Sequence, residues 1–331
     1  MNALGKISSF NENQIMANTS IDHAFTATSL TSAASDPTYA GALSFMRRRY
    51  TKSLEGADAV VWGIPFDAAV SNRPGARFGP QAIRRASAIL DNDPQYPFNR
   101  DLFEGMAVID YGDCLLDYGN HQETPATIER EATKILSSGA FLMSMGGDHF
   151  VTWPLLKAHA AKHGPLALVQ FDAHQDTWFD DGKRIDHGSF VGRAVRDGVI
   201  DPTRSIQVGI RTHAPRDCGI RIVYGHEVED MSATQIAKTI LEHVGDAACY
   251  ITFDIDCLDP AFAPGTGTPV AGGPSSAKML SVLQKLGGLD IKGADIVEVA
   301  PAYDHADITA IAGAAVAMHY LGLLAERRSR R

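Results

Sequence analysis

Short runs of hydrophobic residues alternate along the chain with longer segments in which apolar residues recur at helical spacing. Glycine, proline or polar residues bound each short run, a pattern that predicts buried β-strands. The expected strands are Ala57–Gly63, Met106–Tyr111, Phe141–Met145, Leu166–Phe171, Ser205–Ile210, Ala248–Asp254 and Ile291–Val299. The expected helices are Pro80–Ile89, Thr124–Ser138, Thr152–Lys162, Ala233–His243, Ser276–Leu286 and Ile308–Arg327. This alternation predicts an α/β fold, a three-layer αβα sandwich with a mainly parallel central sheet.

The pattern runs through the middle of the chain without a proline- or serine-rich linker, so we expect a single domain over residues 36–331. Residues 1–35 are rich in Ser, Thr, Asn and Ala and are expected to form a flexible N-terminal extension. Ligands of open parallel sheets bind beyond the carboxyl ends of the strands. Functional residues are therefore expected where each hydrophobic run stops.

Composition narrows the class of protein. Of the 331 residues 45% are hydrophobic, enough for a large core, yet no uninterrupted apolar stretch is long enough to predict a transmembrane helix. The N-terminus lacks the features of a secretory signal. A net charge of -9 argues against a nucleic-acid-binding protein. The four cysteines lie far apart, without zinc-finger spacing or a disulfide framework. We therefore expect a cytoplasmic protein that binds neither nucleic acid nor membrane.

Polar residues cluster at the ends of three expected strands, in the segments SMGGDHF (144–150), VQFDAHQDTW (169–178) and ITFDIDCLDP (251–260). In the second segment Asp172, His174 and Asp176 occupy alternate positions, which share one face if the strand continues. Asp254 and Asp256 do the same in the third segment. Carboxylates that share one face of a buried strand repel each other and lose hydration. A bound cation would relieve both costs.

The candidate ligands in these segments combine four carboxylates with two imidazoles: His149, Asp172, His174, Asp176, Asp254 and Asp256. Each segment alone could be a polar turn or a helix cap, but three together at strand ends favour a metal site. The set exceeds the needs of one tetrahedral zinc and suits Mn²⁺ or similar ions. Bridging carboxylates could hold two ions about 3.5–4 Å apart, and a water between them would become a nucleophile near neutral pH.

The segments GGDH, FDAHxD and TFDIDCLDPAFAPGTGTPVAGG resemble the ureohydrolase family of arginases and agmatinases, over about residues 63–316. The resemblance is strongest to agmatinases, through FDIDCLDPAFAPGTGTP and VEVAPAYD. It implies an arginase-like fold, with residues 36–331 as the catalytic domain, and two Mn²⁺ per subunit. It also implies hydrolysis of a guanidinium group to urea and an amine. By position, one ion would be held by His149, Asp172, Asp176 and Asp254. The other would be held by Asp172, His174, Asp254 and Asp256.

Three residues are expected to act on the substrate. Glu298, at the end of another hydrophobic run, could accept paired hydrogen bonds from a planar guanidinium, although a surface glutamate on an edge strand would look the same. His187, in RIDHGSF, matches a family segment that suggests a proton shuttle to the leaving amine, although a histidine in a loop is often only solvated. The resemblance also implies that Asp176 hydrogen-bonds the hydroxide that bridges the metals.

The choice of substrate depends on the loop after the second segment. Arginases commonly carry Asn where this chain has Trp178, and an aromatic ring suits an aliphatic chain better than the head group of arginine. Agmatine, which yields putrescine and urea, is therefore expected. Guanidinobutyrate and guanidinopropionate stay open, because the chain has both acids and bases that could meet the far end of a substrate: Asp180, Asp181, Lys183, Arg184 and Arg73.

Other interpretations stay open as well. The chain could be a non-catalytic scaffold that keeps the fold, or a related hydrolase that acts on formimino or acetylated amines. Two metals per subunit would exclude a single-zinc deacetylase, which needs only one His and two Asp. The segment SNRPGARFGPQAIRRAS (71–87) resembles a family segment near the active-site mouth, where Arg73 or Arg77 could anchor the loop or a partner subunit. Among the remaining histidines His213 is the foremost candidate for a role. Relatives commonly assemble as trimers or hexamers, so a homo-oligomer is expected.

Overall fold

The computed structural model describes residues 25, 29–31, 37–90 and 94–329. The expected N-terminal extension, residues 1–35, falls almost entirely outside the described residues.

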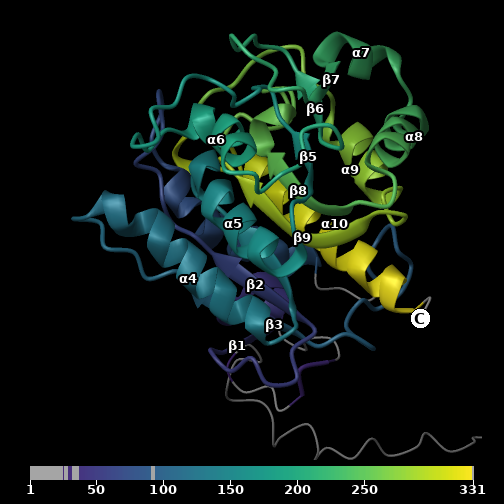
Figure 1. Cartoon of the computed structure of the whole chain (residues 1–331). Coiled ribbons are helices and arrows are strands. Elements are labelled where there is room, and N and C mark those ends of the chain that lie inside the picture. The colour runs from purple at the N-terminus through teal and green to yellow at the C-terminus, as the bar shows by residue number, and fades with distance from the viewer. Residues whose placement is uncertain (1–24, 26–28, 32–36, 91–93, 330–331) are drawn as a thin grey trace, which may run out of the picture.

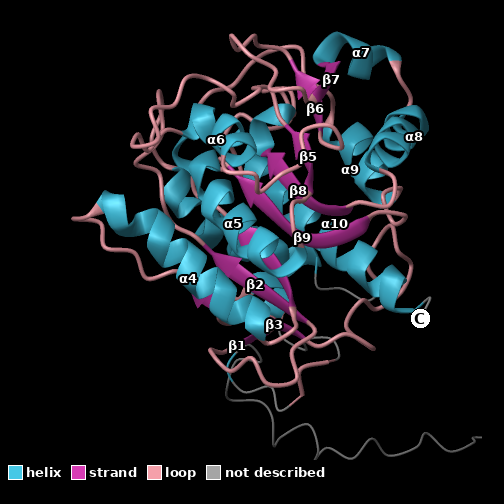
Figure 2. Ribbon diagram, viewed as in Figure 1, coloured by secondary structure: helices cyan, strands magenta, loops and turns pink. Residues whose placement is uncertain are grey.

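A nine-stranded sheet runs through the centre of the protein, with strands in the order β1-β3-β2-β4-β9-β8-β5-β6-β7 (Figure 2). Its strands are β1 (Arg49–Tyr50), β2 (Ala59–Gly63), β3 (Val108–Asp113), β4 (Phe141–Met145), β5 (Ala167–Phe171), β6 (Ile206–Ile210), β7 (Arg221–Tyr224), β8 (Ala248–Asp254) and β9 (Asp290–Val297). Every neighbouring pair is parallel. All carboxyl ends therefore meet at one edge of the sheet.

Helices cover both faces of this sheet and complete the expected αβα sandwich (Figure 1). One layer contains α4 (Thr124–Ser137), α5 (Thr152–His163) and α6 (Phe190–Arg196). The other contains α3 (Gly79–Ser87), α8 (Ala233–Val244), α9 (Ser276–Gln284) and α10 (Ile308–Ser329). The short α7 (Gly225–Asp230) lies beside β6 and β7. Successive strand residues point to opposite faces, so Val60 packs in the core cluster that contains Ile128, and Val61 packs in the one that contains Ile83.

Short 3-10 turns join these elements: η1 (Phe45–Arg47), η2 (Ala76–Phe78), η3 (Ala88–Leu90), η4 (His121–Glu123), η5 (His149–Val151), η6 (His187–Ser189), η7 (Ile255–Cys257) and η8 (Pro301–Tyr303). Two of them, η5 and η7, overlap the polar segments 144–150 and 251–260 that were singled out from the sequence, and η6 follows the loop after the segment 169–178.

All seven strands and six helices expected from the hydrophobic pattern are present, with ends within two residues of the prediction. The strands β1 and β7 and the helices α6 and α7 were not predicted. Both missed strands lie at the edges of the sheet. In β7 only Val223 is buried, and β1 has only two residues, so neither shows the hydrophobic run of a central strand. The two missed helices span 7 and 6 residues, too few for a clear helical period.

Among the described residues one helix, α10, is long and apolar enough to cross a membrane, and 78% of its most apolar window is buried inside the protein. It packs against α3, α9 and β9. Its Tyr320 hydroxyl donates a hydrogen bond to the backbone carbonyl of Asp295 in β9. The apolar character of this helix is therefore that of a core helix.

Candidate metal centre and active site

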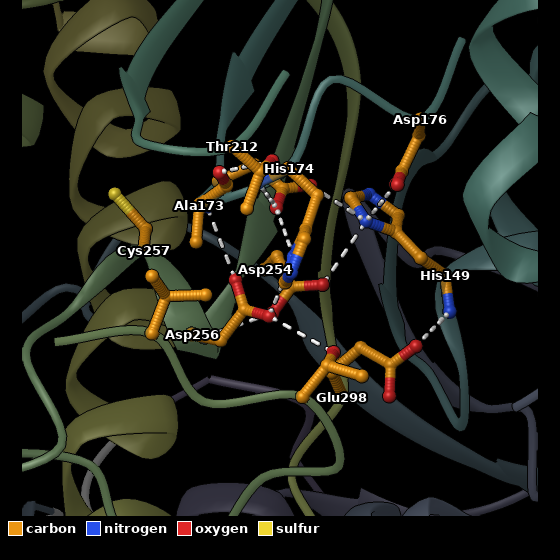
Figure 3. A network of polar contacts seen from close by, with 12 residues as sticks. His149, Ala173, His174, Asp176, Thr212, Asp254, Asp256, Cys257 and Glu298 are labelled. Atoms are coloured by element: carbon orange, nitrogen blue, oxygen red, sulfur yellow. Dashed lines mark hydrogen bonds and ion pairs between the residues drawn. The ribbon is translucent and has the colours of Figure 1, made fainter. Parts of the chain in front are cut away.

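The four central strands of the sheet each end in a polar segment, although these segments are far apart in the sequence. In the sheet β4, β9, β8 and β5 are consecutive neighbours. His149 follows β4, Glu298 follows β9, Asp254 ends β8 and Asp172 follows β5. The strand order therefore gathers the candidate ligands and Glu298 at one place on the carboxyl edge, as Figure 3 shows.

His149 lies at the centre of three carboxylates. Asp148 caps η5 by accepting a hydrogen bond from the backbone N–H of Phe150, which sets the turn that carries His149. The Nδ1 atom of His149 lies 3.0 Å from Asp172 Oδ2, and 3.1 Å from Oδ2 of both Asp176 and Asp254. Despite these distances Nδ1 has no hydrogen-bond partner among the residues that the structure describes. Three carboxylate oxygens thus lie close to one imidazole nitrogen without a hydrogen bond to it.

The other ring nitrogen of His149 decides which tautomer is present. Its Nε2 lies 2.8 Å from the Thr252 hydroxyl, and that hydroxyl donates its only hydrogen to Asp295 Oδ1 at 2.5 Å. The Thr252 oxygen must therefore accept the Nε2–H of His149. In the neutral imidazole this leaves a lone pair on Nδ1, aimed at three carboxylate oxygens. Such an arrangement is repulsive unless a cation lies between them, so the donor set fits a metal ion.

A second cluster adjoins the first. The Nδ1 of His174 lies 3.0 Å from Asp256 Oδ2 and 3.5 Å from Asp172 Oδ1. Both clusters have the ligand-atom spacing of a metal site, and they share Asp172. Asp254 contributes to the first cluster, and its other oxygen accepts a hydrogen bond from the backbone N–H of Asp256 in η7. The arrangement can accommodate two ions side by side.

Burial and crowded charge act on the pKa values of these groups. Burial by itself lowers the pKa of His149, but the carboxylates of Asp172, Asp176 and Asp254 outweigh it and raise that pKa well above its ordinary value. Burial also lowers the pKa of His174, but the charge of Asp256 outweighs it, and the pKa is raised to about 12. Burial and the neighbouring carboxylates raise the pKa of Asp254 well above its ordinary value. Without an ion, protons must supply the positive charge that this centre needs.

The local structure differs from the strand alternation expected from the sequence. Strand β5 ends at Phe171 and β8 at Asp254, so His174 and Asp176 lie on the following loop and Asp256 lies in η7. Asp176 has a φ of 52°, in the left-handed region that non-glycine residues seldom occupy. The loop nevertheless turns these side chains to the same centre. Gln175, between His174 and Asp176, has a different partner: its Oε1 accepts a hydrogen bond from the Ala214 N–H.

Glu298 is buried beside the clusters, not on an edge strand, and its φ is 63°. Its Oε1 accepts a hydrogen bond from the backbone N–H of His149 at 2.9 Å and lies 2.8 Å from His187 Nδ1. Its Oε2 is buried and has no hydrogen-bond partner among the described residues. A buried carboxylate oxygen without a partner is suited to receive a donor from a ligand.

His187 connects Glu298 to the loop after β2. Asp186 caps η6 by accepting a hydrogen bond from the Gly188 N–H, and this turn directs the imidazole towards Glu298. Burial lowers the pKa of His187, but the Glu298 carboxylate outweighs it and raises the pKa to about 9. Its Nε2 faces the Ser71 hydroxyl at 2.8 Å and the Ser71 backbone N–H at 3.1 Å.

A cavity of about 400 Å³ opens over these groups. Its walls contain six of the named candidates, His174, Asp176, Asp254, His187, Trp178 and Arg184, together with Ser71, Phe179 and Asp186. A larger cavity of about 590 Å³, lined by Leu90, Leu280 and Met318, contains none of the candidate ligands. The smaller cavity is therefore the candidate active site.

Several charged residues were candidates, from the sequence, for binding the far end of the substrate, and only some of them line the cavity. Arg184 lines the cavity, and its Nη2 lies 3.0 Å from Asp186 Oδ2. The others are engaged elsewhere or are absent from the cavity wall. Asp180 pairs with Arg193 and Arg196 of α6. Asp181 accepts the backbone N–H groups of Lys183 and Arg184.

The remaining candidates lie outside the cavity wall. The Arg73 guanidinium lies over the ring of Tyr303 at 5.2 Å, and Arg77 pairs with Asp67 at 2.5 Å. Both positions anchor the loop after β2. His213 lines a separate open cavity, where its ring lies 5.8 Å from that of Tyr224.

Several residues of the site did not stand out in the sequence. Ser71, Phe179 and Asp186 line the cavity, and Asp295 supports His149 through Thr252. For Thr252 a signal existed, because strand alternation places it on the same side of β8 as Asp254. For Ser71 the resemblance of the segment 71–87 indicated a place near the active-site mouth but not the contact with His187. For Asp295 no local signal exists, since it acts on a residue from a distant segment.

Comparisons with known proteins agree with this geometry. Residues 57–322 match the model of the arginase family. The agmatinase of Chromobacterium violaceum is 50% identical over 293 residues, which cover 88% of this chain and 91% of that protein. A crystal structure of a hypothetical agmatinase from Burkholderia thailandensis has a TM-score of 0.92 at 50% identity, covering 93% of this chain and 99% of the other. The proclavaminate amidino hydrolase of Streptomyces clavuligerus has a TM-score of 0.84 at 38% identity, covering 88% and 100%.

Proposed function

The chain belongs to the arginase family, and we propose that it hydrolyses the guanidinium group of agmatine to urea and putrescine with two bound Mn²⁺ ions. The observation that carries this proposal is the pair of His/Asp clusters that share Asp172, beside an unpartnered carboxylate oxygen of Glu298. The 50% identity to an agmatinase over most of both chains supports the choice of substrate.

The six ligand candidates would divide between two ions. His149, Asp172, Asp176 and Asp254 would hold one ion, and Asp172, His174, Asp254 and Asp256 the other. Oxygen and imidazole ligands together suit Mn²⁺. When bound, such a pair of ions lowers the pKa of water enough for it to attack an electrophilic carbon near neutral pH. The Asp176 carboxylate, at the cavity wall, would accept a hydrogen bond from the attacking water.

Glu298 would hold the guanidinium. The substrate group is planar and cationic, and its N–H groups would donate charge-assisted hydrogen bonds to Oε2, because Oε1 already faces the His149 N–H and His187 Nδ1. The Glu298 Oε2 atom is unpartnered and Oε1 is already fixed by the His149 N–H, so the carboxylate is oriented before substrate arrives. Holding the guanidinium carbon in one place turns the attack into an effectively unimolecular step.

His187 would supply the proton that the leaving amine needs. Because its pKa is raised to about 9, it is protonated at neutral pH. Nδ1–H remains donated to Glu298, so the proton on Nε2, the nitrogen that faces Ser71 at the cavity wall, is the one that would be transferred. A positioned general acid of this kind contributes roughly 10²–10⁴-fold to the rate.

The far end of the substrate would lie near Trp178, Arg184 and Asp186 at the cavity wall. The Trp178 ring would cover the aliphatic chain, and the Asp186 carboxylate would receive the distal ammonium of agmatine in competition with Arg184. The ion pair of Arg184 and Asp186 also favours a second candidate function. Arg184 could receive the carboxylate of guanidinobutyrate or guanidinopropionate, which makes a guanidino acid hydrolase the alternative.

Urea release from a panel of guanidines tests the proposal. After loading with Mn²⁺, we expect the highest kcat/KM with agmatine, and much lower values with arginine, 4-guanidinobutyrate and 3-guanidinopropionate. A preference for a guanidino acid would overturn the choice of agmatine and leave guanidine hydrolysis in place. No urea from any guanidine, with fewer than one ion per chain, would instead support a non-catalytic scaffold.

A matched pair of variants tests the position of the distal ammonium. Asp186→Asn keeps the Oδ1 acceptor that caps η6 but removes the charge, so KM for agmatine should rise about tenfold while kcat changes little. Asp181→Asn, on the same loop but outside the cavity wall, should leave both constants unchanged. Equal effects of the two substitutions would contradict the assignment.

We further propose that the protein is a cytoplasmic homo-oligomer, a trimer or a hexamer as in its relatives. Light scattering of the purified protein measures the mass directly against the 35.6 kDa chain. A monomer at micromolar concentration would overturn this proposal without affecting the chemistry.

A further inference from the structure

Ser71 lies on the loop after β2, and this loop is held against the candidate active site from several sides. The Ala69 N–H donates a hydrogen bond to Asp148 Oδ2 at 2.8 Å, and the Ala69 carbonyl accepts one from the His187 N–H at 3.2 Å. The Asn72 amide donates to the Gly267 carbonyl at 2.9 Å. Ser71 is thereby fixed against the imidazole of His187, a residue 116 positions away in the sequence.

The two nitrogens of His187 have different partners. Nδ1 faces only a carboxylate oxygen, Glu298 Oε1, and must donate to it. Nε2 faces two groups of Ser71, the backbone N–H and the side-chain hydroxyl. A backbone N–H can only donate, so it stabilises Nε2 when that nitrogen is unprotonated. A hydroxyl can donate or accept, so it alone can serve Nε2 in both protonation states.

This contact matters because a residue that donates a proton is present in both its protonated and its neutral form during each turnover. Before the transfer Nε2 carries hydrogen and needs an acceptor. After the transfer Nε2 has a lone pair and needs a donor. The charged groups that act most strongly on the imidazole, Glu298, Asp176 and Asp148, are carboxylates and favour the protonated form. Arg184 and His174 line the same cavity. Asp186 precedes His187, but its oxygens are engaged by the Gly188 N–H and by Arg184.

We propose that Ser71 is a positioning residue for His187, whose hydroxyl accepts from Nε2–H in the protonated state and donates to Nε2 in the neutral state. This inference rests on the proposed function, in which His187 is the proton donor. Ser71 is exposed at the cavity wall, so its hydroxyl is free to rotate between the two arrangements.

The substitution Ser71→Ala tests the proposal. It keeps the backbone N–H against Nε2 and removes the only acceptor that this nitrogen has in the described part of the chain, so the protonated form of His187 becomes less stable. One hydrogen bond of this kind corresponds to about one pH unit. We expect the alkaline limb of the kcat profile to move about one unit towards lower pH, with KM for agmatine nearly unchanged. Ser71→Thr, which keeps a hydroxyl, should restore the limb.

A control variant separates this role from simple anchoring of the loop. Asn72→Ala removes the neighbouring contact to Gly267 and leaves the Ser71 hydroxyl in place. The alkaline limb of its kcat profile should lie at the same pH as in the unmodified protein, even if KM changes. The proposal is overturned if Ser71→Ala leaves the limb in place, or if Asn72→Ala moves it equally.

A second readout keeps the test independent of catalysis. NMR titration of the His187 ring in the metal-free protein, identified by its loss in His187→Asn, should give a lower pKa in Ser71→Ala than in the unmodified protein. An unchanged titration would overturn the role of Ser71 even if the protein hydrolyses agmatine. Absence of urea release from any guanidine would overturn the proposed function, while the titration would still decide the Ser71–His187 contact.

Discussion

At the scale of single residues, the imidazole of His149 is oriented from behind by a chain of hydrogen bonds. The chain runs from its Nε2 through the Thr252 hydroxyl to Asp295, which is buried within the sheet. Asp295 also accepts hydrogen bonds from Thr152 and Tyr250. These additional donors hold the carboxylate in place. Partners of this kind fix the tautomer and direction of a metal-binding histidine, so they act on metal affinity without touching the metal.

Substitution of Thr252 by Val should therefore weaken Mn²⁺ binding by about tenfold or more, measured by calorimetric titration of the metal-free protein. Thr152→Val is the matched control, because Thr152 is equally buried and donates to the same Asp295 carboxylate at 2.8 Å, but it does not contact His149. Equal losses in affinity from the two variants would contradict the orienting role of Thr252.

His187, the proposed proton donor, sets a second expectation at this scale. The pKa of His187 is raised to about 9 by Glu298, above its ordinary value of about 6.5. The protonated form is therefore present at neutral pH and is lost as the pH rises through about 9. We expect the pH profile of kcat to fall on its alkaline side near that value.

His187→Asn should lower kcat by about 10²-fold or more and remove this alkaline limb. A profile whose alkaline limb survives in His187→Asn would assign the limb to another group.

At the scale of elements, the loop from 177 to 186 is organised by its attachment to α6. The Asp180 carboxylate, nearly inaccessible to solvent, pairs with both Arg193 and Arg196. Arg193 also donates a hydrogen bond to the Arg184 carbonyl and lies over the rings of Phe150 and Trp153. An acid that the sequence offered as a ligand for substrate is thus a structural anchor. Through these contacts Asp180 fixes the positions of Trp178 and Arg184 at the cavity wall.

Asp180→Asn should lower the free energy of unfolding by about 1–3 kcal/mol, since it leaves the buried Arg193 guanidinium without its charged partner. Denaturant unfolding measures the loss. Glu242→Gln, which breaks the exposed pair of Lys238 and Glu242, is expected to change the stability by less than about 0.5 kcal/mol. A similar small effect for Asp180→Asn would show that the loop does not depend on this anchor.

At the scale of the whole molecule, the metal site lies where four neighbouring strands end, so its charge balance affects the central sheet. Four buried carboxylates share the centre with two imidazoles. An ion that binds only the folded chain adds to its stability, by about 2.7 kcal/mol when free metal is a hundredfold above the dissociation constant. We therefore expect metal binding and folding to be coupled in this protein.

Removal of metal with a chelator should lower the melting temperature, and Mn²⁺ added in excess should restore it in a concentration-dependent way. Differential scanning calorimetry of the protein at fixed pH measures both changes. The double variant Asp172→Asn, Asp254→Asn removes the two carboxylates that would bridge the ions, so its melting temperature should not respond to Mn²⁺. A melting temperature that ignores the chelator in the unmodified protein would contradict the coupling.

The central elements of this fold could be predicted from the sequence because their signal is local. A buried strand needs a hydrophobic run and a covering helix needs a helical period, and both are visible within about ten residues. The strands β1 and β7 were not predicted because each lies at an edge of the sheet, where fewer neighbours cover it. Their residues therefore need not all be apolar. The six ligand candidates were visible for a similar reason, since clustered carboxylates are costly beside a buried strand.

The sequence alone therefore determined the α/β class, the central elements and the chemical character of the metal centre. The tertiary structure decided which segments meet. Strand order places β4, β9, β8 and β5 side by side, and with them His149, Glu298, Asp254 and Asp172. It also brings Ser71 against His187 and moves Asp180 from the substrate to α6. Contacts across 100 or more positions, such as that between Ser71 and His187, leave no trace in a local pattern, because they depend on how the strands are ordered in space.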